Sequence, residues 1–127
     1  MIECTSKEKD FETLFTNGRH TAISDVPPEK GGGDAGFRPH ELLEASLACC
    51  INVFIRKYAA GHHIPLAGVE VEVSLNRQVP GETVFEYGVE LTGNITAAQR
   101  QELLPAVESC PVYQILSGKI SCAPLPL

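Results

Sequence analysis

Residues 39–61 read PHELLEASLACCINVFIRKYAAG, and their middle, residues 42–55, is a long and almost wholly apolar run. Pro39 suits the first turn of a helix and Gly61 suits its end, so the stretch predicts one long helix. Apolar side chains occupy nearly every side of that helix instead of a single stripe. Such a helix must be covered on several sides, and in a chain of 127 residues the cover is a sheet, other helices or a second subunit.

Two strands are predicted after the helix. Residues 69–79 alternate apolar and polar side chains, residues 83–93 do so again, and Pro80-Gly81 turns the chain between them. Antiparallel pairing with one apolar face is the natural outcome. The opposite face carries glutamates, which we interpret as a solvated surface and not as a general acid/base pair. They are Glu70, Glu72, Glu86 and Glu90.

The N-terminal part of the chain predicts a hairpin followed by a loop. Residues 11–25 contain two short segments joined at Asn17-Gly18, a dipeptide that favours tight hairpin turns. Residues 26–37 are rich in Pro and Gly and lack the spacing of either phosphate-binding glycine motif. We therefore expect a mobile or tightly folded loop.

The C-terminal part predicts two helices and a strand. Thr96 and Gln99 have capping-box spacing and open a helix in which Pro105 should produce a kink. A short helix follows Pro111, and residues 120–125 read as a closing strand. The whole order is strands, long helix, strands, helices and strand, which is an α+β fold.

Length and charge limit the possible classes of protein. The 127 residues predict a single domain over residues 1–127. A net charge of −6, with ten Lys and Arg residues that form no run, argues against nucleic acid as a partner. No segment reaches the roughly 20 apolar residues that span a bilayer, and the N-terminus has no signal-peptide core. We expect a cytoplasmic protein without a membrane partner.

The cysteines are the candidate chemical groups. In a reducing compartment an odd number favours free or transiently oxidised thiols over a static disulfide framework. Cys50 shares a helical face with Leu47 and Phe54, an apolar setting that disfavours thiolate and is typical of a packed core residue. Cys110 precedes Pro111 at a helix start, where the helix dipole favours thiolate. A dithiol redox pair and two packing cysteines both remain possible. The five are Cys4, Cys49, Cys50, Cys110 and Cys122.

Two distant segments together carry a family pattern. Residues 31–50 read GGGDAGFRPHELLEASLACC, and residues 108–116 read ESCPVYQIL. A Gly-rich loop, Pro-x-Glu-Leu-Leu, a small-residue helix with a cysteine and a later Cys-Pro-Val resemble the OsmC/Ohr family of osmotically inducible and organic-hydroperoxide-resistance proteins. The resemblance implies an OsmC-like fold, with antiparallel sheets around a long central helix, in an intertwined homodimer.

The same resemblance implies a thiol peroxidase that acts on organic hydroperoxides without a metal or cofactor. Cys50 would attack the peroxide and become a sulfenic acid, and Cys110 would condense with it to a disulfide. Glu41 and Arg38 would support the site. The implied partners are a small-molecule organic hydroperoxide, an external dithiol reductant and a second copy of the chain.

The chain also departs from the hydroperoxide-resistance branch of that family. The glutamate that holds the thiolate there falls at His40, one position before Glu41, and the matching arginine cannot be aligned. The chain therefore resembles a divergent OsmC-like branch, and the alternative is a redox-sensing or small-ligand-binding protein without efficient peroxidase activity. We interpret Cys49, about 100° from Cys50 around the helix, as a packing residue. His62 and His63 match no tetrahedral zinc spacing, so no metal site is expected.

Overall fold

The computed structural model describes residues 1–126. The chain divides into two compact units, one spanning Met1–Leu43 and the other beginning at Glu44. Helix α1 (Pro39–Gly61) starts in the first unit and runs through the boundary into the second. One domain over residues 1–127 stays a prediction.

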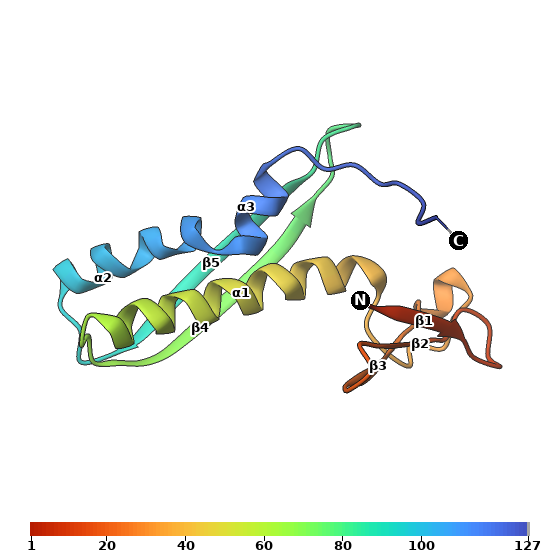
Figure 1. Ribbon diagram of the computed structural model, residues 1–127, viewed down its shortest axis with the longest axis horizontal. Helices are drawn as coiled ribbons and strands as arrows, with labels where there is room; N and C mark the ends of the chain where they lie inside the picture. Colours follow the sequence, from red (N-terminus) through yellow and green to blue (C-terminus); the bar gives the residue numbers. More distant parts are fainter. Residues whose placement is uncertain (127) are drawn as a thin grey trace. The chain divides into compact units, whose positions relative to one another are not determined.

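The first unit contains a three-stranded antiparallel sheet in the order β1-β2-β3 (Figure 1). Its strands are β1 (Glu3–Ser6), β2 (Thr13–Thr16) and β3 (Thr21–Ser24). The predicted hairpin joins β2 to β3, and the Asn17 side chain accepts the backbone N–H of Arg19 at 2.9 Å to stabilise the turn. Strand β1 was not predicted, because its four residues are all exposed and show no apolar alternation.

The Gly-rich loop after β3 is tightly folded around one carboxylate. Asp25 is only 2% exposed and accepts the backbone N–H groups of Val26 at 2.7 Å, Gly33 at 3.2 Å and Ala35 at 3.0 Å. A 3₁₀ helix, η1 (Pro28–Lys30), lies inside the loop. In phosphate-binding loops, backbone N–H groups of this kind point toward a ligand. Here the N–H groups of Gly33 and Ala35 donate to the Asp25 carboxylate.

The end of this loop is held against β3. The Ser24 hydroxyl donates to the Phe37 carbonyl at 2.8 Å, and the two residues form an isolated parallel bridge. A Cβ at Gly36 would collide with the backbone carbonyl of Ile23, so the approach requires glycine at this position. The loop therefore reaches the start of α1 in a defined conformation.

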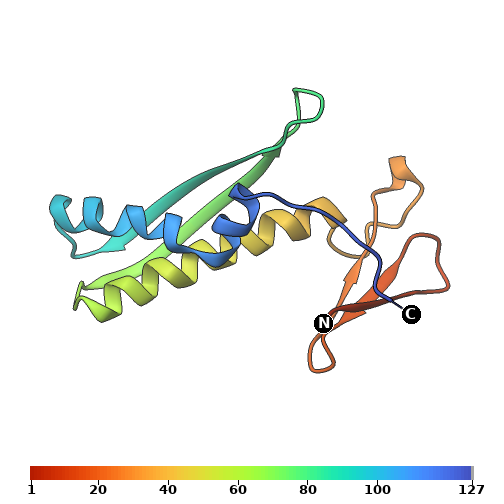
Figure 2. The same ribbon diagram turned by 45° about the horizontal axis from the view of Figure 1, so that its top comes forward.

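The second unit packs α1 and a second helical segment along a hairpin (Figure 2). The hairpin consists of β4 (Leu66–Asn76) and β5 (Val84–Gly93), and the helical segment of α2 (Ala97–Leu103), the 3₁₀ helix η2 (Leu104–Ser109) and α3 (Pro111–Ser117). The predicted capping box of Thr96 and Gln99 is confirmed. At the predicted kink, α2 gives way to η2, which contains Pro105.

Strand pairing confirms the predicted apolar face of the hairpin. Val69 lies opposite Leu91, and Val71 lies opposite Val89. These side chains pack on a core that includes α1 residues at four-residue spacing, and the four glutamates of the other face are exposed as expected. The α1 residues are Leu47, Ile51, Ile55 and Ala59.

The predicted closing strand over residues 120–125 is wrong, because these residues form no strand and are all exposed. Pro124 lacks the N–H group that a strand donates.

Side chains of α1 bond to backbone groups of β4. Asn52 donates to the Val69 carbonyl at 2.8 Å, and Glu44 accepts the Leu75 N–H at 3.0 Å. Within the part of the chain that the structure describes, no helix is long and apolar enough to cross a membrane.

The hydrogen bonds to the Asp25 carboxylate predict that the fold is less stable in acid. Backbone N–H donors, Ala35 first and Val26 next, lower the pKa of Asp25 from its ordinary 3.8. This contribution to the free energy of unfolding is therefore fully present above the ordinary pKa and is lost as pH falls through the lower, folded value. Asp25→Asn keeps one acceptor oxygen where the carboxylate has two, so it cannot accept the Val26 bond and the Gly33 and Ala35 bonds together. It should lower the melting temperature at neutral pH, and its deficit should shrink in acid.

Exposed Asp10 supplies the control, because Asp10→Asn removes the same charge without a buried bonding partner. Thermal melts followed by circular dichroism over a pH series test the idea. An Asp25→Asn deficit that is the same at every pH would contradict it.

Candidate functional site

The structure joins Cys50 to Cys110 in a disulfide. Cys50 lies on α1, and Cys110 lies 60 residues later, between η2 and α3. Their Cα atoms are 6.0 Å apart, within the range that a disulfide spans. The two thiols singled out in the sequence therefore meet in the fold.

The two sulfur atoms occupy unequal environments. Cys110 is 0% exposed and belongs to the core with Leu103 and Val107. Its sulfur accepts the backbone N–H of Tyr113 at 3.4 Å, as the N-cap of α3. Cys50 is partly exposed and packs at the border of the same core. The site thus has one partly exposed cysteine and one fully buried cysteine.

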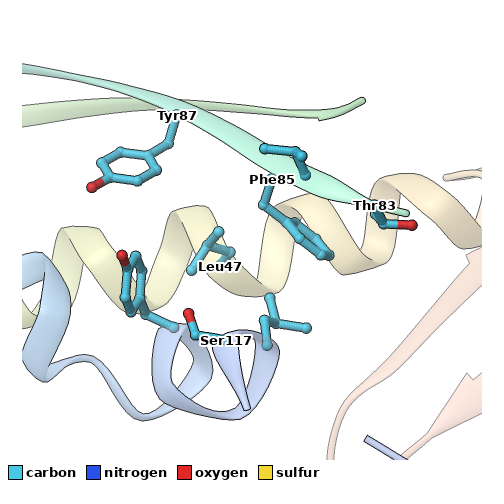
Figure 3. A pocket seen from close by; sticks show the side chains of 8 residues that line it. Leu47, Thr83, Phe85, Tyr87 and Ser117 are labelled. Atoms are coloured by element: carbon cyan, nitrogen blue, oxygen red, sulfur yellow. The ribbon is translucent and has the colours of Figure 1, made fainter. Parts of the chain in front are cut away.

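A pocket of about 240 Å³ adjoins the elements that carry both cysteines. Figure 3 shows Phe85 and Tyr87 of β5 facing Leu47 of α1 across it. Leu47 precedes Cys50 by three residues, and Tyr113, whose N–H contacts the Cys110 sulfur, lines the opposite side. The remaining lining residues are Thr83, Val84, Leu116 and Ser117.

Two tyrosines lie among the polar residues of this pocket. The rings of Tyr87 and Tyr113 meet edge to face, with centroids 6.2 Å apart. Burial, with smaller effects of Tyr113 and Glu108, raises the pKa of Tyr87 above its ordinary value of 10.0, so its hydroxyl stays neutral. Neither tyrosine was singled out in the sequence. Tyr87 reads there as one apolar position of a strand, and only the tertiary fold places it opposite Tyr113.

Glu41 and Arg38, the expected supporting residues, lie at the start of α1. The Glu41 carboxylate accepts the backbone N–H of Arg38 at 2.8 Å, which is the bond that a third-position glutamate makes to the residue capping a helix. Glu41 precedes Cys50 by nine residues of the same helix, or about two and a half turns. The structure therefore gives Glu41 a helix-capping contact.

Cys4, Cys49 and Cys122 are exposed free thiols. The expected packing role of Cys49 is wrong for the described chain, because α1 turns this side chain away from the core stripe. It lines a shallow hollow with Asn52, Val53, Arg56 and other residues of α1 and β4.

His62 lies just beyond the end of α1 and contacts that helix. The His62 ring stacks on Tyr58, with centroids 3.9 Å apart, and its Nδ1 lies 2.9 Å from the Tyr58 carbonyl oxygen. Among residues 1–126 there is no group of three or more His, Cys, Asp and Glu side chains placed to hold a metal ion. The candidate site therefore consists of thiols, an apolar pocket and backbone donors.

The geometry predicts which thiols oxidise. Mild oxidation should join Cys50 to Cys110 and leave Cys4, Cys49 and Cys122 free for alkylation. Peptide mapping by mass spectrometry after alkylation checks this, with the fully reduced protein as control. A disulfide from Cys110 to Cys49 would contradict the assignment.

Comparison with known proteins identifies the family. The family model described as OsmC-like protein matches residues 31–123. No curated protein matches the sequence.

Solved structures share the fold. An OsmC-like protein from Mycoplasma pneumoniae aligns with a TM-score of 0.76 at 21% identity, covering 93% of this chain and 86% of that one. An organic hydroperoxide resistance protein OsmC from Legionella pneumophila has a TM-score of 0.65 at 22% identity, over 93% and 88% of the two chains. An organic hydroperoxide resistance protein from Elizabethkingia anophelis has a TM-score of 0.66 at 19% identity, over 93% and 89%. The α+β architecture is thus that of OsmC-like structures, and with a matched pattern that includes both Cys50 and Cys110, this chain belongs to the OsmC-like protein family.

Proposed function

We propose that the protein is a cysteine thiol peroxidase that reduces organic hydroperoxides. The observation that carries the proposal is the Cys50–Cys110 disulfide, near a pocket lined by Leu47, one helical turn before Cys50, and by Tyr113, whose N–H contacts the Cys110 sulfur. The Cys50 thiolate attacks the terminal peroxide oxygen, the O–O bond breaks, and the alkoxide takes a proton from water to leave as an alcohol. The Cys110 sulfur then attacks the Cys50 sulfenic acid, the disulfide forms and water leaves. An external dithiol restores both thiols.

The unequal burial of the sulfurs supports this assignment of roles. A peroxide must reach the attacking sulfur from solvent, and Cys50 is the partly exposed member of the pair. Cys110 is sealed in the core, where an intramolecular partner can reach it and a substrate cannot. Burial therefore favours Cys50 as the attacking thiol and Cys110 as the resolving thiol.

The pocket supports an organic substrate over hydrogen peroxide. Leu47, Phe85 and Leu116 offer apolar surface, and burying a hydrocarbon group there contributes roughly 25 cal/mol for each Å² removed from water. Hydrogen peroxide has no such group to bury. Two solved relatives are described as organic hydroperoxide resistance proteins, which supports the same substrate class.

Activity measurements test the proposal. With dithiothreitol as reductant, the wild type should consume cumene hydroperoxide faster than hydrogen peroxide, and Cys50→Ser should reduce consumption to the rate without protein. Without reductant and with excess hydroperoxide, Cys110→Ser should consume one equivalent and then accumulate overoxidised Cys50, because no resolving thiol is present. Cys49→Ser is the matched control, since it removes the neighbouring exposed thiol, and it should retain wild-type turnover.

Equal consumption by wild type and Cys50→Ser would eliminate the peroxidase. A redox-sensing protein is the second candidate, and the observation favouring it is that the Glu41 carboxylate bonds to the Arg38 N–H at the start of α1. A sensor would form the Cys50–Cys110 disulfide once with stoichiometric hydroperoxide and would show no sustained turnover.

We further propose that the chain works as a homodimer. The first unit has strands but no buried apolar residue, since every buried apolar side chain of the described chain lies between Leu47 and Cys110. A small sheet of this kind needs additional apolar cover to be stable. On α1, Leu43 is 48% exposed and Val53 is 37% exposed, so part of this apolar helix is uncovered by its own chain. A second copy would supply the missing cover.

Light scattering coupled to size-exclusion chromatography should give about twice the 13.7 kDa chain mass. Val53→Glu should weaken the dimer, because it would place a charge on the uncovered face of α1. The control is Val79→Glu, at a position 55% exposed and remote from α1 along the chain. A wild type that stays monomeric at micromolar concentration would overturn this proposal.

A further inference from the structure

Of the two cysteines in the disulfide, Cys50 is partly exposed and Cys110 is fully buried. We propose that the external dithiol attacks the sulfur of Cys50 and that Cys110 is always the leaving group, an inference that rests on the proposed function. Cys50 is partly exposed, whereas Cys110 is 0% exposed. The choice of sulfur in thiol–disulfide exchange depends on such access.

Attack on Cys110 would need space that the core fills. A thiolate approaches a disulfide in line with the S–S bond, so attack on Cys110 must come from its side away from Cys50. Cys110 belongs to the buried cluster with Leu103, at 0% exposure, and Val107, at 2%. Its own N–H also donates to the Val107 carbonyl at 3.1 Å. Opening this side would require displacing the core residues that surround Cys110.

The backbone at the start of α3 favours departure of Cys110. The Tyr113 N–H lies 3.4 Å from the Cys110 sulfur. As the S–S bond breaks, negative charge develops on that sulfur, and an N–H donor already in place stabilises it. Because a main-chain group supplies this donor, it is present in the oxidised protein before the reductant arrives.

The exchange balances as follows. One thiolate of the dithiol bonds to the Cys50 sulfur, and the S–S electron pair passes to Cys110, which leaves as a thiolate and later takes a proton from water. The second thiolate of the reductant then attacks its own sulfur bound to Cys50, closing the reductant's internal disulfide and releasing the Cys50 thiolate. The dithiol loses two electrons, and the protein disulfide gains them.

This direction explains why the reductant should be a dithiol. After the first attack the Cys110 thiolate lies beside the new Cys50 mixed disulfide and can expel a monothiol, which restores the starting state. A second thiol on the same reductant molecule has a high effective concentration and competes with that reversal. A monothiol has no such advantage.

A trapping experiment with the folded full-length chain tests the inference. The exposed cysteines Cys4, Cys49 and Cys122 are replaced by Ser, and the remaining pair is oxidised with diamide, so that no peroxidase activity is needed. Brief treatment with N-acetylcysteine, acid quenching, alkylation with N-ethylmaleimide and peptide mapping then locate the adduct. We expect the N-acetylcysteine adduct on Cys50 and the maleimide on Cys110, in at least about tenfold excess over the reverse arrangement.

The same oxidised protein unfolded in guanidinium chloride is the control, and it should give both adducts in comparable amounts, because burial no longer protects Cys110. Comparable amounts in the folded protein, or an excess on Cys110, would overturn the inference. Failure of hydroperoxide turnover would instead overturn the proposed function and leave this result intact, because diamide forms the disulfide directly.

Discussion

One stripe of α1 packs against the hairpin and the second helical segment. This packing determines the positions of the other residues of the site. Successive residues of an α-helix are separated by about 100°, so Leu47, Ile51, Ile55 and Ala59 form a narrow buried stripe. Cys50 lies about 60° from Leu47, at the edge of that stripe, where a side chain touches the core and still reaches solvent.

The same helical geometry separates the neighbouring thiols. Cys49 lies about 160° from Ile51 around α1, on the opposite side from the core. A shift of the buried stripe by one residue toward the N-terminus would put Cys49 in the position that Cys50 now takes. The hydrophobic burial of four aliphatic side chains therefore decides which of the adjacent cysteines meets Cys110, and no interaction of the thiols themselves is required.

Two carboxylates near the start of α1 use their charge for local structure. Asp25 accepts three backbone N–H groups and organises the Gly-rich loop, and Glu41 accepts the N–H of the residue that caps the helix. Both are explained by unpaired backbone donors at a loop and at a helix start. The bond to Arg38 explains Glu41 as part of the helix start, and its support of the thiol site stays a prediction.

Local patterns in the sequence correctly predicted helix α1 and the paired strands β4 and β5. They also predicted the capping box at Thr96 and the hairpin at Asn17. Each of these features depends on neighbours within a few residues. The α+β class followed from their order. The prediction of a strand over residues 120–125 failed, since a strand also needs a partner, and local apolar residues do not show whether the fold supplies one. Only the tertiary structure could bring Cys50 to Cys110, bury one cysteine and leave the other partly exposed, and set Tyr87 opposite Tyr113, because these relations join segments separated by 60 and 26 residues and depend on which helical face the whole core buries.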